Sequence, residues 1–107
     1  MNEARPREIL FLEEGGFSDW MDALENRDGA MYDAIVARLE RVEDGNFGDC
    51  GPVGEGVFEL RFLKSGPGYR IYFSEYDDIV IVLKAGTKKT QKADISTAQK
   101  LWRNYNA

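Results

Sequence analysis

Apolar and polar residues alternate along much of the second half of the chain. Three short runs, 57–63, 69–74 and 79–84, are rich in β-branched and aromatic residues. The segments between them, 64–68 and 75–78, contain the Gly, Pro, Ser and Asp residues that favour turns. Short alternating runs separated by turns predict three strands joined as an antiparallel meander.

The first half of the chain combines one apolar run with helical spacing. Residues 7–13 contain four consecutive apolar residues and stop at two glycines, which predicts a first strand. Ser18 is a suitable N-cap for a short helix over residues 19–24. A longer helix is predicted from about residue 30 to residue 44, because one apolar stripe repeats at spacings of four, four and three: Met31, Ile35, Leu39 and Val42.

The remaining segments complete a β-α-α-β-β-β-α order. Residues 46–55 are rich in glycine and predict a loop, and residues 91–105 predict a terminal helix. The two early helices are expected to form a hairpin behind the first strand. The sequence therefore predicts a single α+β domain over residues 1–107, with a small antiparallel sheet and an N-terminal helical hairpin.

Strand alternation also predicts the register of the sheet. If the apolar faces of the first two meander strands coincide, their pairs are fixed as Phe58–Phe73, Leu60–Ile71, Phe62–Tyr69, Glu59–Tyr72 and Arg61–Arg70. The same logic pairs the third strand as Ile79–Phe73 and Ile81–Ile71, and places Lys84 on the polar face.

The predicted polar face brings two arginines directly opposite each other. Arg61 facing Arg70 is repulsive unless an anion or a carboxylate lies between them. Glu59 and Asp94 are the candidates within the chain, and a phosphate is the external one. Alternatively, Glu59 neutralises Arg61 locally and the face is only solvated.

Tyr72 lies on the same predicted face. An aromatic ring among cations is typical of single-stranded RNA binding, in which bases stack on rings and phosphates meet positive charge. The alternative is an ordinary tyrosine on the surface of a sheet.

Charge is divided unevenly along the chain. Residues 1–60 carry 5 Lys/Arg and 15 Asp/Glu, a balance of −10, whereas residues 61–92 carry 7 and 3, a balance of +4. The last fifteen residues add +1, which gives the total of −5. The basic part is the candidate for a nucleic-acid surface, and surface charge without a role is the alternative.

The rest of the composition excludes several function classes. The chain has no histidine and one cysteine, Cys50, so a Ser-His-Asp triad, a Cys/His zinc site and an intrachain disulfide are all excluded. We expect no metal and no cofactor. No apolar run is long enough for a membrane helix, and residues 1–5 lack the apolar stretch of a secretory signal. A cytoplasmic protein is therefore expected.

Five short segments, in this order, carry a family resemblance: Asn46-Phe47-Gly48-Asp49, Val53-Gly54-Glu55-Gly56-Val57-Phe58-Glu59-Leu60-Arg61, Gly66-Pro67-Gly68-Tyr69-Arg70-Ile71-Tyr72-Phe73, Lys88-Lys89-Thr90-Gln91 and Asp94-Ile95. The series resembles the RelE/ParE-superfamily toxins, in particular the addiction-module killer proteins of the HigB group. The resemblance covers nearly the whole chain and implies the small sheet flanked by N-terminal helices that the patterns predict.

The resemblance implies a toxin of a type II toxin–antitoxin system that cleaves messenger RNA on the ribosome and thereby arrests growth. Its implied partners are the ribosome, messenger RNA and a cognate antitoxin of the helix-turn-helix HigA type. By position, the basic residues of such toxins fall here on Arg61, Arg70 and Lys88. The predicted polar face adds Tyr72 and Lys84 as candidate RNA contacts, and Lys89 is a further one at its edge. Many members have Gly-Gly-Asp-Lys before Thr-Gln, whereas this chain has Gly86-Thr87-Lys88-Lys89, so either lysine can take the role.

The implied reaction is attack of an RNA 2′-hydroxyl on the adjacent phosphate. Arg70 and Arg61 would hold the phosphorane, because guanidinium groups bind phosphate oxygens in a bidentate manner. Without histidine, the base is Asp94, a lysine of lowered pKa or a ribosomal group. Asp94 has an alternative role at the start of the last helix, where an acid favours the helix dipole.

Two other functions remain open at this stage. A toxin of the same fold can bind DNA gyrase and cleave nothing, as ParE-like members do. A non-toxic interaction domain is the third possibility.

Overall fold

The fold is described from a computed structural model that covers residues 5–62 and 66–107. Predictions that involve Leu63, the turn residues Lys64 and Ser65, and residues 1–4 lie outside the described residues. The elements, in chain order, are β1 (Glu8–Phe11), α1 (Phe17–Arg27), α2 (Gly29–Glu43), β2 (Cys50–Gly54), β3 (Val57–Phe62), β4 (Tyr69–Tyr76), β5 (Ile79–Gly86) and α3 (Gln91–Tyr105), with short 3-10 turns at Glu13–Gly15 and Lys88–Thr90.

The five strands form one mixed sheet in the order β1-β5-β4-β3-β2. The meander β3-β4-β5 is antiparallel as predicted, but β1 pairs in parallel with β5. The prediction of a purely antiparallel sheet is therefore wrong. The predicted loop 46–55 is also wrong in part, because β2 pairs with β3 as an edge strand. The glycines and Pro52 of this segment resemble a loop in composition. Proline is nevertheless tolerated at the edge of a sheet, which is where β2 lies.

All five predicted pairs between β3 and β4 are confirmed, including Arg61 opposite Arg70. The predicted pairs between β4 and β5 are wrong: Ile79 pairs with Tyr76 and Ile81 with Ser74. A two-residue turn at 77–78 sets this register, and an irregularity between Tyr72 and Phe73 then shifts it. Beyond that shift Lys84 lies opposite Tyr72, on the face where it was expected.

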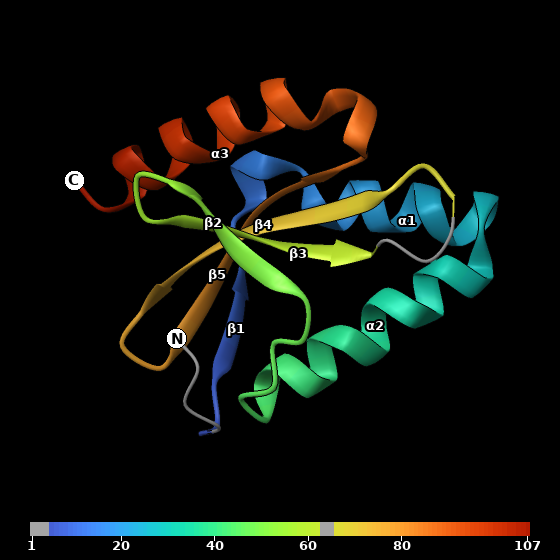
Figure 1. Cartoon of the computed structure of the whole chain (residues 1–107), viewed down its shortest axis with the longest axis horizontal. Helices are drawn as coiled ribbons and strands as arrows, with labels where there is room; N and C mark the ends of the chain where they lie inside the picture. The colour runs from blue at the N-terminus through green and yellow to red at the C-terminus, as the bar shows by residue number, and fades with distance from the viewer. Residues whose placement is uncertain (1–4, 63–65) are drawn as a thin grey trace.

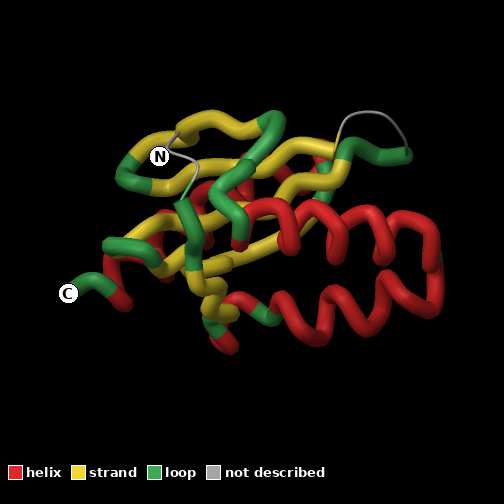
Figure 2. Tube along the Cα trace, turned by 90° about the horizontal axis from the view of Figure 1, so that it is seen from below, coloured by secondary structure: helices red, strands yellow, loops and turns green. Residues whose placement is uncertain are grey.

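Two apolar cores lie on the two faces of the sheet. One joins α1 and α2 to the face of Leu60, Ile71 and Phe73. The predicted stripe of α2 is buried in this core, and Figure 2 shows α1 and α2 side by side as the expected hairpin. The other core joins α3 to the opposite face, around Tyr72 and Leu83. In Figure 1, α3 accordingly crosses the sheet on the side away from the hairpin.

Candidate functional site

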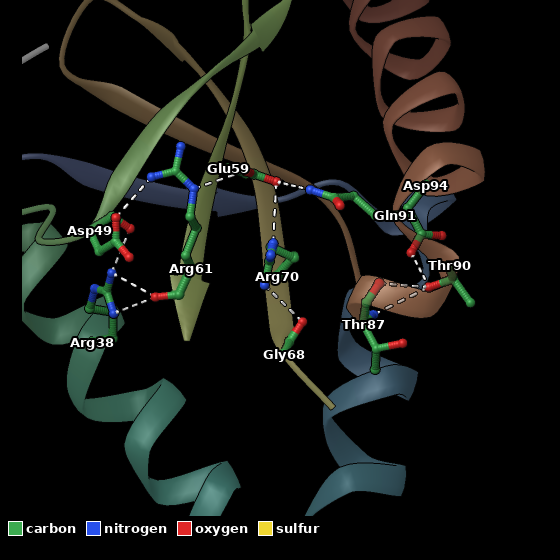
Figure 3. A network of polar contacts seen from close by, with 10 residues as sticks. All are labelled: Arg38, Asp49, Glu59, Arg61, Gly68, Arg70, Thr87, Thr90, Gln91 and Asp94. Carbon is green, nitrogen blue, oxygen red and sulfur yellow. Dashed lines mark hydrogen bonds and ion pairs between the residues drawn. The ribbon is translucent and has the colours of Figure 1, made fainter. Parts of the chain in front are cut away.

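A polar network occupies the α3 side of the sheet, and Glu59 is at its centre (Figure 3). The Glu59 side chain is 7% exposed. Its Oε2 accepts a hydrogen bond from Arg61 Nε at 3.0 Å, and its Oε1 lies 3.6 Å from Arg70 Nε. The repulsion expected between the two arginines is thus offset by a carboxylate of the chain itself. Among the anions that the sequence offered for the space between Arg61 and Arg70, the structure places the carboxylate of Glu59 there.

Arg61 is held by a second acid. Its Nη1 donates to Asp49 Oδ1 at 2.8 Å. Hydrogen bonds to Glu59 and Asp49 raise the pKa of Arg61 above its ordinary value. An incoming phosphate would therefore compete with two carboxylates for this guanidinium, whose side chain is 29% exposed. Asp49 was not singled out from the sequence, because only the fold brings it to β3.

Arg70 is buried and more loosely paired. Its Nη1 donates to the carbonyl of Gly68 at 3.0 Å, while its Nε makes no hydrogen bond with any residue that the structure describes. The 3.6 Å separation from Glu59 is longer than a hydrogen bond. Arg70 Nε is therefore an unused donor, but it is buried beside Glu59 and is not exposed to solvent.

Lys88 lies beside Arg70, at the exposed edge of the network. The backbone N–H of Lys88 donates to the carbonyl of Pro67 at 3.2 Å. A Cβ added at Gly68 would lie 3.3 Å from both Arg70 Nη1 and Lys88 Cβ, so the Arg70 guanidinium and the first carbon of the Lys88 side chain both lie close to this glycine. Both Lys88 and Lys89 are exposed, but only Lys88 is placed at Arg70 by these contacts. The choice between Lys88 and Lys89 for the RNA role stays a prediction, and these contacts place only Lys88 close to Arg70.

The start of α3 supplies further members of the network. Gln91 Nε2 donates to Glu59 Oε1 at 2.9 Å, a contact that sequence reasoning missed. Asp94 is 8% exposed, and its Oδ2 accepts from Thr90 Oγ1 at 2.6 Å. Asp94 packs directly onto Gly86, the cross-strand partner of Arg70. It lies in the first turn of the helix, as its alternative role requires, and also borders the cationic edge.

The structure contradicts the prediction that the Tyr72 ring is accessible on the polar face of the sheet. Its side chain is fully buried, because α3 covers this face of the sheet. Its hydroxyl makes no hydrogen bond with a described residue. Burial, reinforced by the charges of Glu59 and Asp94, raises the pKa of this phenol far above its ordinary value. In this conformation Tyr72 cannot stack on a base, and Lys84 opposite it is only partly exposed.

Arg38 supports the network from the hairpin side and was also missed. It is not part of the apolar stripe of α2, yet it is 9% exposed. Its guanidinium donates to the carbonyls of Phe47, Asp49 and Arg61 at 2.8–3.2 Å and lies over the ring of Phe62. Burial lowers its pKa from the ordinary value. It thereby ties the segment that carries Asp49 to the strand that carries Arg61.

Within residues 5–62 and 66–107, no three His, Cys, Asp or Glu side chains come together as a metal-binding group. In that same part of the chain, no helix combines the length and the apolar character needed to cross a membrane.

Comparison with known proteins identifies the family. The profile of the family described as phage derived protein Gp49-like (DUF891) matches residues 19–105. The chain belongs to the Gp49-like family. An uncharacterized protein of Haemophilus influenzae is 41% identical over 86 residues, which cover 79% of this chain and 84% of that protein. No solved structure is found to match the chain.

The Gp49-like match contains the whole network and leaves out β1. Every member of the network, from Arg38 to Asp94, falls within residues 19–105. The more specific resemblance to RelE and HigB remains a prediction, because neither name occurs in these matches.

Proposed function

We propose that this Gp49-like protein is the toxin of a type II toxin–antitoxin pair, and that it cleaves messenger RNA on the ribosome. The observation that supports it most is that Arg70 Nη1 and the Cβ of Lys88 both lie close to Gly68, at the edge of the network. Arg70 lies next to the carboxylate of Glu59, and Lys88 is exposed to solvent. Such a pair suits a phosphate that gains negative charge during the reaction.

In the proposed reaction, the RNA 2′-oxygen forms a bond to the adjacent phosphorus and loses its proton to a base. The bond from phosphorus to the 5′-oxygen breaks, and that oxygen takes up a proton. The products are a 2′,3′-cyclic phosphate and a 5′-hydroxyl. Arg70 stabilises the phosphorane, and Lys88 adds charge or donates the proton to the leaving oxygen.

The base is the open role in this mechanism. Glu59 and Asp94 are buried carboxylates of the network, and both already accept hydrogen bonds from other side chains. Because the Asp94 carboxylate is engaged in this way, we favour a base supplied by the ribosome over Asp94. A ribosomal base accords with a reaction that needs the ribosome. The proposed site of action is therefore the cytoplasm. The proposed neutralising partner is a helix-turn-helix antitoxin.

Purified ribosomes programmed with a defined message test the proposal. We expect cuts with 5′-hydroxyl ends from the wild-type protein, and a loss of roughly 10²-fold in cleavage rate for Arg70→Ala. Lys88→Ala should lose at least tenfold. Lys89→Ala is the matched control, because it removes the same charge from the adjacent exposed position, and it should stay within about threefold of wild type.

Two results would overturn the proposal. One is the absence of cuts together with inhibition of DNA gyrase, which would assign the toxin to the other target. The other is absence of growth arrest on expression of the folded wild-type protein, which would favour an interaction domain. Circular dichroism of each variant excludes misfolding as the cause of lost activity.

A further inference from the structure

A groove lies on the hairpin side of the sheet, whereas Glu59 and Arg70 share the other face with Tyr72. The groove is open, has a volume of about 370 Å³, and is bordered by β1, α1 and α2. Its floor is apolar and includes Phe11, Met21 and Val36. Several of its lining residues, such as Met21 and Leu39, belong to the core of the hairpin face, whereas Tyr72 beneath the network belongs to the other core.

The strand that borders the groove is unusually apolar for an exposed edge. β1 is the last strand of the sheet on its side, and no strand among the described residues pairs with its outer edge. Phe11 is 44% exposed and Leu10 is 43% exposed. An uncovered edge strand with large apolar side chains is a feature that proteins otherwise avoid, because it invites association.

The rim of the groove is acidic on both sides. Asp22 borders it from α1, and Glu40 and Glu43 border it from α2, one helical turn apart. No lysine or arginine lines the groove. The complementary ligand has an apolar stripe flanked on both sides by positive charge.

We propose that this groove binds a basic amphipathic helix of a partner protein. An apolar floor between two acidic rims fits a helix that inserts residues at i, i+3, i+4 and i+7 and places Lys or Arg beside them. Only the identification of that partner as the antitoxin rests on the proposed function. Binding here leaves the network at Arg70 uncovered, so such a partner would inhibit by blocking entry to the ribosome.

A labelled peptide tests the proposal directly. The probe is an 18-residue amphipathic helix of leucine and lysine, and its counterpart has glutamate in place of every lysine. Fluorescence anisotropy with the full chain should show binding of the lysine peptide and at least tenfold weaker binding of the glutamate peptide. Raising the salt concentration should weaken the interaction, because the rim charges are solvent-exposed.

Two matched pairs of variants locate the contact. Glu40→Lys should weaken binding of the lysine peptide at least fivefold, whereas Glu25→Lys, an exposed acid of α1 outside the groove, should stay within twofold. Phe11→Ser should weaken it at least fivefold, whereas Leu10→Ser removes an equally exposed residue that does not line the groove and should not. Equal effects within either pair would overturn the proposal.

The competing occupant is a second copy of the chain. Sedimentation of the free protein that shows a dimer, dissociated by Phe11→Ser but not by Leu10→Ser, would replace the proposal with self-association. A failure of the groove proposal can be distinguished from a failure of the proposed messenger RNA cleavage. A protein that binds the peptide but cuts no message refutes only the nuclease, and one that cuts message but ignores the peptide refutes only the groove.

Discussion

Gly86 is the position at which a single methyl group would disturb the network most. It lies at the end of β5, opposite Arg70, and carries the carboxylate of Asp94 against its backbone. A Cβ at this position would lie 1.9 Å from Asp94 Oδ2 and 2.7 Å from Thr90 Oγ1. No real contact tolerates the shorter distance, so Gly86→Ala must displace Asp94 and break its 2.6 Å hydrogen bond from Thr90.

The cost of this displacement follows from its two parts. Insertion of a methyl group into a packed site costs about 1–3 kcal/mol, and the lost hydrogen bond about 1 kcal/mol. We therefore expect Gly86→Ala to lower the free energy of unfolding by roughly 2–4 kcal/mol. In the ribosome assay, the same variant should also lose activity, because Asp94 and Thr90 border the edge at which Arg70 and Lys88 both lie close to Gly68.

Urea unfolding followed by tryptophan fluorescence measures this effect. The control is Gly29→Ala at the start of α2, where an added Cβ meets no atom within 4 Å, and stability should change by less than about 1 kcal/mol. Asp94→Ala removes the group that clashes. The double variant Gly86→Ala, Asp94→Ala should therefore be more stable than the sum of the two single effects by at least about 1 kcal/mol. Strict additivity, or an unperturbed Gly86→Ala, would refute the reasoning.

Three further predictions concern two buried side chains and the half-buried Cys50. Tyr72→Phe removes a buried hydroxyl that has no partner among the described residues, so the free energy of unfolding should rise by about 1 kcal/mol; a clear loss in the urea assay would reveal a partner for the hydroxyl. Arg38→Lys replaces a guanidinium that bonds three carbonyl groups by a single ammonium group, and should lower the same quantity by roughly 2 kcal/mol; unchanged stability would contradict this role. Burial raises the pKa of Cys50, so less thiolate is present at any given pH and iodoacetamide should react more slowly than with glutathione at pH 7; a faster reaction would contradict this.

The sequence predicted best where the two faces of a strand differ chemically. β3 and the first half of β4 alternate between large apolar residues and Glu or Arg, so only one register keeps both faces consistent, and all five predicted pairs are confirmed. β5 offers no such constraint. Its run Ile79–Leu83 is apolar on both faces, because the hairpin covers one face and α3 the other.

The site was predictable only in part. Alternation placed Glu59, Arg61 and Arg70 on one face, but it does not say what covers that face. The apolar positions of α3, such as Ile95, Ala98 and Trp102, recur at helical spacing and were the available sign that this helix would pack on the sheet over Tyr72. Asp49 and Gln91 reach Arg61 and Glu59 only through the tertiary fold, so no local sequence pattern marks them as members of the network.

The opposed arginines have different roles once their partners are counted. Arg61 and Arg70 contribute two positive charges, and Asp49 and Glu59 two negative ones, so these four residues are neutral together. Arg61 already donates two hydrogen bonds to carboxylates, whereas the nearest carboxylate oxygen is 3.6 Å from Arg70 Nε. In the proposed reaction a phosphate oxygen would displace fewer hydrogen bonds to carboxylates at Arg70 than at Arg61, but it would first have to uncover the Arg70 side chain, which is 7% exposed. The additional positive charge in the proposal comes from Lys88, whose Cβ lies near Gly68. The cationic edge thus consists of the buried Arg70 and the exposed Lys88. Arg61 instead holds the Glu59 carboxylate in position through its hydrogen bond.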